Sequence, residues 1–89
     1  MSSKTESMYY YGGHYVGRYI YIINPHNVKY EPMSGITIDV AADAMINLVN
    51  LFKANVNMVF NDIKFDIPYN SGITKQDIIN KYFEQLKVR

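Results

Sequence analysis

The segment VNMVFNDIKFDI, residues 56–67, decides the fold because its residue pattern and its turn agree on one register. Apolar residues alternate along both halves of the segment, and Asn61 and Asp62 stand between the halves. A two-residue turn there predicts an antiparallel hairpin in which Lys64 and Asp66 face solvent. The pairing places one apolar set on a single buried face. That set is Val56, Met58, Phe60, Ile63, Phe65 and Ile67.

The segment before this hairpin predicts the main helix, which begins at Thr37 or Asp39 as its cap and ends at Asn55. Its polar residues form one narrow stripe, Asp39, Asp43, Asn47, Asn50 and Lys53. Apolar residues fill more than half of the circumference, whereas an ordinary surface helix has an apolar face about 100° wide. We therefore expect the helix to pack on the sheet and on a second body, either the other helix or another subunit.

The segment after the hairpin predicts a loop at residues 68–72 and then a second helix. Thr74 opens this helix, and Asp77 stands where a capping box places its acidic residue. One apolar stripe follows at helical spacing, Ile78, Ile79, Tyr82, Phe83 and Leu86. This helix is expected to cover the same face of the sheet as the first one.

The N-terminal third predicts further strands around Gly12-Gly13, since paired glycines favour a two-residue hairpin turn. The hairpin joins Met8–Tyr11 to His14–Asn24, and residues 28–33 return as a short strand after a turn at Asn24–Asn27. The predicted fold class is α+β, a small mostly antiparallel sheet with two helices packed on one face, in the order β-β-(β)-α-β-β-α. We expect a flexible tail at residues 1–7 and a single domain at residues 8–89.

Composition excludes several classes of function. The chain has 89 residues, a formal net charge of +1 and no cysteine, which removes disulfides and thiolate metal sites. No apolar run approaches the ~18 residues of a membrane span, so no membrane contact is expected. A cysteine-free chain fits a reducing cytoplasm, or the host cytoplasm if the protein is viral.

No group of residues predicts catalysis, a metal or a cofactor, so the chain is not expected to be an enzyme. His14 and His26 stand beside predicted turns without further ligands at metal-site spacing. Asp39 and Asp43 lie one helical turn apart, near a helix N-terminus that favours negative charge in any case. The Gly12-Gly13 pair is not followed by a helix, as a phosphate loop would be.

Residues 34–67 resemble the first half of the phosphocarrier protein of sugar phosphotransferase systems. The likeness is a Gly-Ile pair before a helix, then the helix and a hairpin closed by an asparagine-containing turn. It covers about a third of the chain. The positions that hold that family's phosphorylated histidine and its arginine are Thr37 and Asp39 here, so the resemblance implies a supersecondary pattern without the phosphotransfer chemistry.

Most of the nine tyrosines precede residue 31, and two groups can be separated. Tyr19 and Tyr21 lie in the middle of a long strand, where they are expected to fill sheet faces. Those nearer the glycine turn exceed what a small core can absorb, and exposed tyrosine is common at protein interfaces. The predicted partner-binding residues are Tyr9, Tyr10, Tyr11, His14, Tyr15 and Arg18.

The sequence thus predicts a small non-enzymatic protein-interaction module that acts through a tyrosine-rich hairpin and self-associates as a homo-oligomer. A phage or viral type of protein that binds and inhibits a host factor fits its size and its lack of chemistry. The alternative is binding of a nucleotide or single-stranded nucleic acid, since bases stack on tyrosine for about 1–3 kcal/mol each. Such a site also needs cations, and the aromatic segment holds only Arg18.

Overall fold

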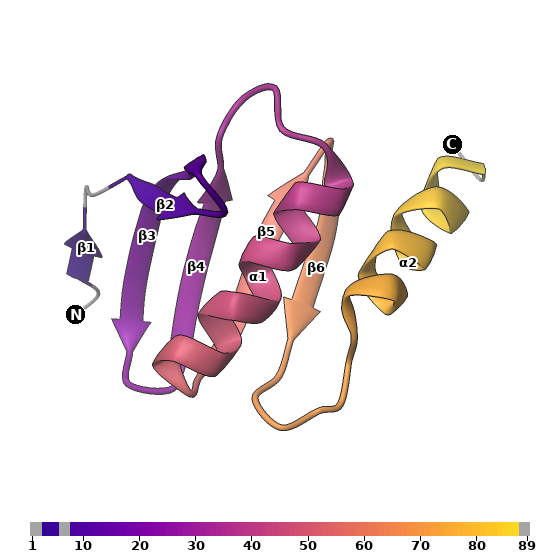
Figure 1. Ribbon diagram of the computed structural model, residues 1–89. Helices are drawn as coiled ribbons and strands as arrows, with labels where there is room; N and C mark the ends of the chain where they lie inside the picture. The colour runs from indigo at the N-terminus through magenta and orange to yellow at the C-terminus, as the bar shows by residue number, and fades with distance from the viewer. Residues whose placement is uncertain (1–2, 6–7, 88–89) are drawn as a thin grey trace.

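The computed structural model describes residues 3–5 and 8–87, which form one sheet with helices packed beside it (Figure 1). In these residues the strands and helices are β1 (Ser3–Thr5), β2 (Tyr9–Tyr11), β3 (His14–Asn24), β4 (Asn27–Pro32), α1 (Ile38–Phe52), β5 (Asn55–Phe60), β6 (Ile63–Ile67) and α2 (Lys75–Lys87). The sheet order is β1-β3-β4-β5-β6, and β2 also pairs with β3. Among the described strands, β4 and β5 form the one parallel pair. The predicted α+β class, mostly antiparallel with two helices on one face, is confirmed.

Strand β1 lies where composition predicted a tail. Ser3–Thr5 pairs antiparallel with β3, and Ser3 lies opposite Ile22. The pairing has a simple cause, since β2 covers only the first part of the eleven-residue β3 and leaves backbone groups of its second part without a neighbour on that side. Met1, Ser2, Glu6 and Ser7 of the expected flexible tail lie outside the described residues.

The β5–β6 hairpin forms in the register that its pattern predicts. Phe60 lies opposite Ile63, Met58 opposite Phe65, and Val56 opposite Ile67. Asn61 and Asp62 have φ angles of 49° and 67°, the left-handed values that a type I′ turn requires at both central positions. Five of the six inward residues are buried, and Phe60 packs against the core as a partly buried side chain.

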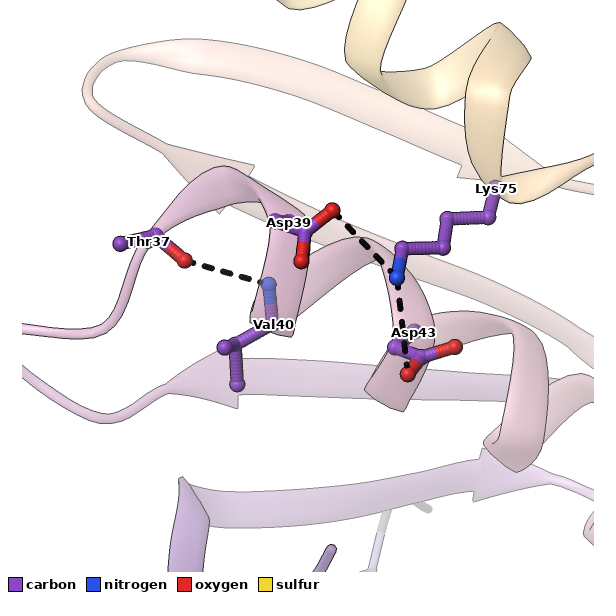
Figure 2. Close-up of polar contacts among 5 residues, drawn as sticks. All are labelled: Thr37, Asp39, Val40, Asp43 and Lys75. Carbon is purple, nitrogen blue, oxygen red and sulfur yellow. Dashed lines mark hydrogen bonds and ion pairs between the residues drawn. The ribbon is translucent and has the colours of Figure 1, made fainter.

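Helix α1 begins at the predicted cap. The Thr37 hydroxyl accepts a hydrogen bond from the Val40 backbone N–H at 3.3 Å (Figure 2). The helix ends at Phe52, because Lys53 takes a left-handed conformation with φ 50°. The predicted end at Asn55 was wrong, since that residue already starts β5.

The second body against α1 is α2. Lys75 at the start of α2 places its Nζ 3.3 Å from Asp39 Oδ1 and 3.7 Å from Asp43 Oδ2 (Figure 2). In α2, Ile78 and Tyr82 are buried in the common core. The sequence predicted that α1 packs on the sheet and on either the other helix or another subunit. In the structure the other helix, α2, packs against it.

The capping box of α2 is formed as predicted. The Thr74 N–H donates to Asp77 Oδ2 at 2.8 Å, and the Asp77 N–H donates to Thr74 Oγ1 at 3.2 Å. The hydrogen bonds from the Thr74 backbone and hydroxyl lower the pKa of the Asp77 carboxyl. These contacts define where α2 starts and how the loop at residues 68–73 approaches it.

Three asparagines tie together the end of the sheet where β4 and β5 begin. Asn24 Oδ1 accepts from Asn27 Nδ2 at 3.0 Å, and Asn27 Oδ1 accepts from Asn55 Nδ2 at 3.3 Å. Asn55 Oδ1 in turn accepts from the Tyr69 backbone N–H at 2.8 Å. The asparagine ladder, Asn24, Asn27 and Asn55, thus joins the β3–β4 turn, the parallel pair and the loop before α2.

Changing Asn55 to alanine should lower the free energy of unfolding by about 1 kcal/mol, because it removes two partly solvated hydrogen bonds. Urea unfolding followed by circular dichroism would measure the loss. The matched control is Asn57→Ala, on the same strand and outside the ladder. Equal losses in both variants would contradict the structural role of the ladder.

Candidate functional site

The β2–β3 hairpin turns at the predicted glycine pair. Gly12 and Gly13 have φ angles of 66° and 91°, in the region that glycine adopts without a steric penalty. Across the turn, Tyr11 lies opposite His14, and Tyr10 lies opposite Tyr15. The glycines therefore set the register in which the tyrosines of the hairpin face one another.

The register shifts beyond Tyr10, and alternation along β2 sorts the tyrosines between two sides. Tyr9 lies opposite Gly17, so Val16 is the extra residue of a β-bulge. Directly opposite residues share a face, and successive residues of β2 point to opposite faces. Tyr9 and Tyr11 therefore lie on one side of the hairpin, and Tyr10 and Tyr15 lie on the other.

The inner side of the hairpin is fastened to the core. Asn47 of α1 donates a hydrogen bond from its Nδ2 to the Tyr9 hydroxyl. The Tyr9 ring meets the Tyr30 ring edge to face, with centroids 6.3 Å apart, and stacks on the Tyr11 ring at 6.1 Å. Burial raises the pKa of the Tyr9 hydroxyl, an effect that the Asn47 hydrogen bond opposes. Tyr9 and Tyr11 thus act as anchors of the hairpin.

Tyr30 lies beneath these anchors and is completely buried. Its hydroxyl donates to the Val16 carbonyl oxygen at 2.5 Å, at the bulge itself. Burial raises the pKa of this hydroxyl far above its ordinary value. Gly17 leaves room for the ring, since a Cβ at that position would lie 2.8 Å from Tyr30 Cε1.

The outer side of the hairpin presents aromatic surface to solvent. Tyr10 is 58% exposed and Tyr15 is 51% exposed, with their rings edge to face and centroids 5.0 Å apart. Met8, just before β2, is 55% exposed. We call Met8, Tyr10 and Tyr15 the hairpin patch. His14 and Arg18 of β3 are also exposed.

The six predicted partner-binding residues therefore divide by role. Tyr10, Tyr15, His14 and Arg18 are exposed, whereas Tyr9 and Tyr11 face the core and hold the hairpin in place. Met8 was missed, although it directly precedes the first tyrosine of the hairpin. Alternation along β2 separates Tyr9 and Tyr11 from Tyr10, whereas no residue pattern predicts the bulge at Val16 that places Tyr9 opposite Gly17.

The helix-free face of the sheet also carries tyrosines. Tyr19 lies opposite Glu31, and Tyr21 lies opposite Lys29. The Tyr21 hydroxyl donates to Glu31 Oε2 at 3.2 Å, and the Lys29 Nζ lies 5.8 Å from the centroid of the Tyr21 ring. Both tyrosines are half-buried, so they fill a sheet face as expected, on the side away from the helices.

Residues 3–5 and 8–87 lack two features that would bear on function. They contain no cluster of three or more histidine, cysteine, aspartate or glutamate residues arranged to hold a metal ion. Neither helix in these ranges has the length and hydropathy that crossing a bilayer requires. His26 lies exposed in the β3–β4 turn, where its backbone N–H donates to Asn24 Oδ1 at 2.8 Å.

Comparisons with protein-family models, with curated proteins and with solved structures find no significant match to this chain. The resemblance of residues 34–67 to the phosphocarrier protein thus rests on the order of the elements alone. At the two positions where that family carries its chemistry, Thr37 caps α1 and Asp39 pairs with Lys75.

Proposed function

We propose that this chain is a non-enzymatic protein-binding module and that the hairpin patch contacts the partner. The observation that carries the proposal is the Tyr10–Tyr15 pair, exposed on one side of a hairpin whose other side is anchored in the core. Tyrosine supplies a large contact area for little loss of side-chain freedom, and it is enriched among the residues that dominate binding energy.

The anchoring matters because ordering flexible side chains opposes association. The Tyr9 ring and hydroxyl bind the hairpin to Tyr30 and Asn47, and the Tyr10 and Tyr15 rings support each other. A partner would therefore meet an aromatic pair that is already positioned. Tyr69 is also exposed, but it lies in the loop between β6 and α2 and outside any strand pair.

Charge indicates what the partner surface should offer. The segment from Met8 to Asn24 contains Arg18 and His14 and no acidic residue. An apolar surface with an acidic rim would complement it, since complementary charge at the rim speeds association. A second copy of the chain is one such partner in the proposed homo-oligomer, and a host factor inhibited by a phage or viral protein stays a prediction.

Changing Tyr10 and Tyr15 together to serine should weaken partner binding by tenfold or more, because each truncation at a tyrosine contact costs about 1–2 kcal/mol. Sedimentation equilibrium at micromolar concentration measures self-association, and co-precipitation from the cell in which the protein acts measures other partners. Tyr69→Ser is the matched control, since it removes an exposed tyrosine far from the hairpin in the sequence.

Retention of every partner by the Tyr10→Ser, Tyr15→Ser variant would exclude the hairpin patch as the interface. Nucleic-acid binding gives a different outcome: a labelled single-stranded oligonucleotide would bind at low salt, where the electrostatic contribution is strongest. The helix-free face argues against it, because Lys29 and Lys64 are balanced there by Glu31 and Asp66.

A further inference from the structure

Helix α2 extends past the last strand of the sheet. Strand β6 ends the strand order, and Figure 1 shows α2 beyond β6 and outside the span of the sheet. A hollow of about 210 Å³ lies between them, and its apolar lining is Phe65, Ile67, Ile73 and Ile78. A second hollow of about 340 Å³ continues toward Lys64 and Gln85, and Lys81 lines both hollows. We call this pair of hollows the β6–α2 seam.

Backbone hydrogen-bonding groups of β6 point into the seam. After a two-residue turn, the residues next to the turn exchange hydrogen bonds, and every second residue repeats this. Ile63, Phe65 and Ile67 therefore bond to β5, which leaves the N–H and C=O groups of Lys64 and Asp66 on the free edge. In the described part of the chain, the one bond to this edge comes from Lys81, whose Nζ donates to the Lys64 carbonyl oxygen at 3.0 Å.

We propose that the β6–α2 seam binds an extended peptide segment of a partner protein, added as a strand antiparallel to β6. Strand addition to a sheet edge is a recurrent mode of peptide recognition, in which backbone bonds supply affinity and side-chain positions supply specificity. The seam offers both, because free backbone groups lie beside an apolar hollow that a helix covers. This site is separate from the hairpin patch and does not depend on it.

The charges on β6 specify the side chains of the peptide. In an antiparallel pair, opposite residues share a face. The peptide residue opposite Phe65 would point into the apolar hollow, and those opposite Lys64 and Asp66 would point to the helix-free face. The complementary peptide reads, from its N-terminus, apolar, basic, apolar, acidic, apolar, with its basic residue opposite Asp66 and its acidic residue opposite Lys64.

Lys81 controls access to this edge. Its Nζ donates a hydrogen bond to the Lys64 carbonyl oxygen and lies 5.2 Å from the centroid of the Phe65 ring. Proteins often protect edge strands with lysine so that they do not pair indiscriminately. An exposed, flexible lysine can leave when a peptide supplies its own N–H donor, so Lys81 raises the threshold for binding without closing the site.

Two labelled synthetic peptides of identical composition test the proposal by fluorescence anisotropy with the full chain. Val-Lys-Val-Glu-Val has the complementary order, and Val-Glu-Val-Lys-Val reverses its charges. The first should bind about fivefold tighter or more, since two cross-strand pairs change from opposite to like charge. The double variant Lys64→Asp, Asp66→Lys should reverse this preference. Both side chains are exposed, so the exchange inverts the order of charges on β6 and leaves the buried core unchanged.

A third variant tests the role of the edge lysine. Lys81→Met keeps the apolar stem of the side chain and frees the Lys64 carbonyl, so it should bind the first peptide several-fold tighter. Absence of binding to both the natural chain and Lys81→Met, or equal binding of the two peptides, would overturn the proposal. Tyr10→Ser, Tyr15→Ser should leave peptide binding unchanged, so a failure here is distinct from a failure of the hairpin patch.

Discussion

Replacing Tyr30 with alanine should lower the free energy of unfolding by about 3–5 kcal/mol, the cost typical of removing a buried aromatic ring. The expectation follows from its complete burial and from its contact with the Tyr9 ring, which it holds in place. Small domains have a free energy of unfolding of about 5–15 kcal/mol in total, so the variant would keep only a small part of its stability. Urea unfolding followed by circular dichroism measures the change.

Tyr30→Phe separates the ring from its hydroxyl. The variant keeps the ring and removes the donor 2.5 Å from the Val16 carbonyl oxygen, which still accepts from the Met33 N–H at 3.0 Å, so the loss should be about 0.5–1.5 kcal/mol. If Tyr30→Phe were as stable as the natural chain at neutral pH, the hydrogen bond at the bulge would contribute nothing, and only packing would explain Tyr30→Ala.

The same hydroxyl predicts how stability depends on pH. Burial raises the pKa of Tyr30 above its ordinary value of 10.0, so the folded chain keeps this proton at a pH where the unfolded chain has lost it. The contribution is complete below pH 10 and declines as pH rises above it, because the unfolded state then binds fewer protons. Tyr30→Phe should show a shallower loss of stability between pH 10 and pH 11 than the natural chain.

Replacing Gly17 with alanine should destabilise the fold by about 1–3 kcal/mol, the usual cost of forcing extra volume into a packed site. The added Cβ would lie 2.8 Å from Tyr30 Cε1 and 2.8 Å from Tyr9 Cβ, closer than packed carbon atoms allow. Tyr30 is buried and Tyr9 is held by Asn47, so neither can retreat freely. Thermal unfolding followed by circular dichroism provides the measurement.

A double-mutant cycle identifies the cause of that loss. In the Tyr30→Ala background the collision with the ring is absent, so Gly17→Ala should cost markedly less there than in the natural chain. An equal cost in both backgrounds would mean that the Tyr30 ring does not set the need for glycine. The loss would then come from Tyr9 or from the backbone of β3.

The β5–β6 hairpin and the α2 cap could be predicted because local chemistry determines them. Alternation from Val56 to Ile67, with Asn61 and Asp62 between the strands, allows one register that places the six alternating apolar residues on one face. Thr74 and Asp77 are three residues apart and satisfy each other's backbone donors. Both features depend only on residues close in the chain.

The pairing of Tyr9 with Gly17 could not be predicted, because it depends on an irregularity in strand pairing. Without the bulge at Val16, the register from Tyr10–Tyr15 would place Tyr9 opposite Val16 and not opposite Gly17. The shift brings Tyr9 beside Gly17, where the absence of a side chain admits the Tyr30 ring. Only tertiary packing reveals which tyrosines a core of this size can hold.

The seam between β6 and α2 was likewise invisible in the sequence. The stripe of α2 predicts that one side is buried, but it does not say whether a strand or another helix covers it. In the structure Ile78 and Tyr82 of α2 pack into the common core, Lys75 pairs with Asp39 and Asp43 of α1, and α2 lies beyond β6 (Figure 1). The wide apolar surface of α1 predicted either the second helix or another subunit against it, and α2 takes the first of these places, while Leu51 of α1 stays exposed.

The parallel pairing of β4 with β5 has a consequence for the order in which the chain folds. The β3–β4 and β5–β6 hairpins need only short turns, whereas Asn27 and Asn55 meet across 28 positions in the sequence. Closing a long loop loses more chain entropy than forming a local turn. The β4–β5 pairing should therefore form late and together with α1. The two hairpins would then assemble separately before they meet, and Asn55→Ala should slow their joining in stopped-flow refolding.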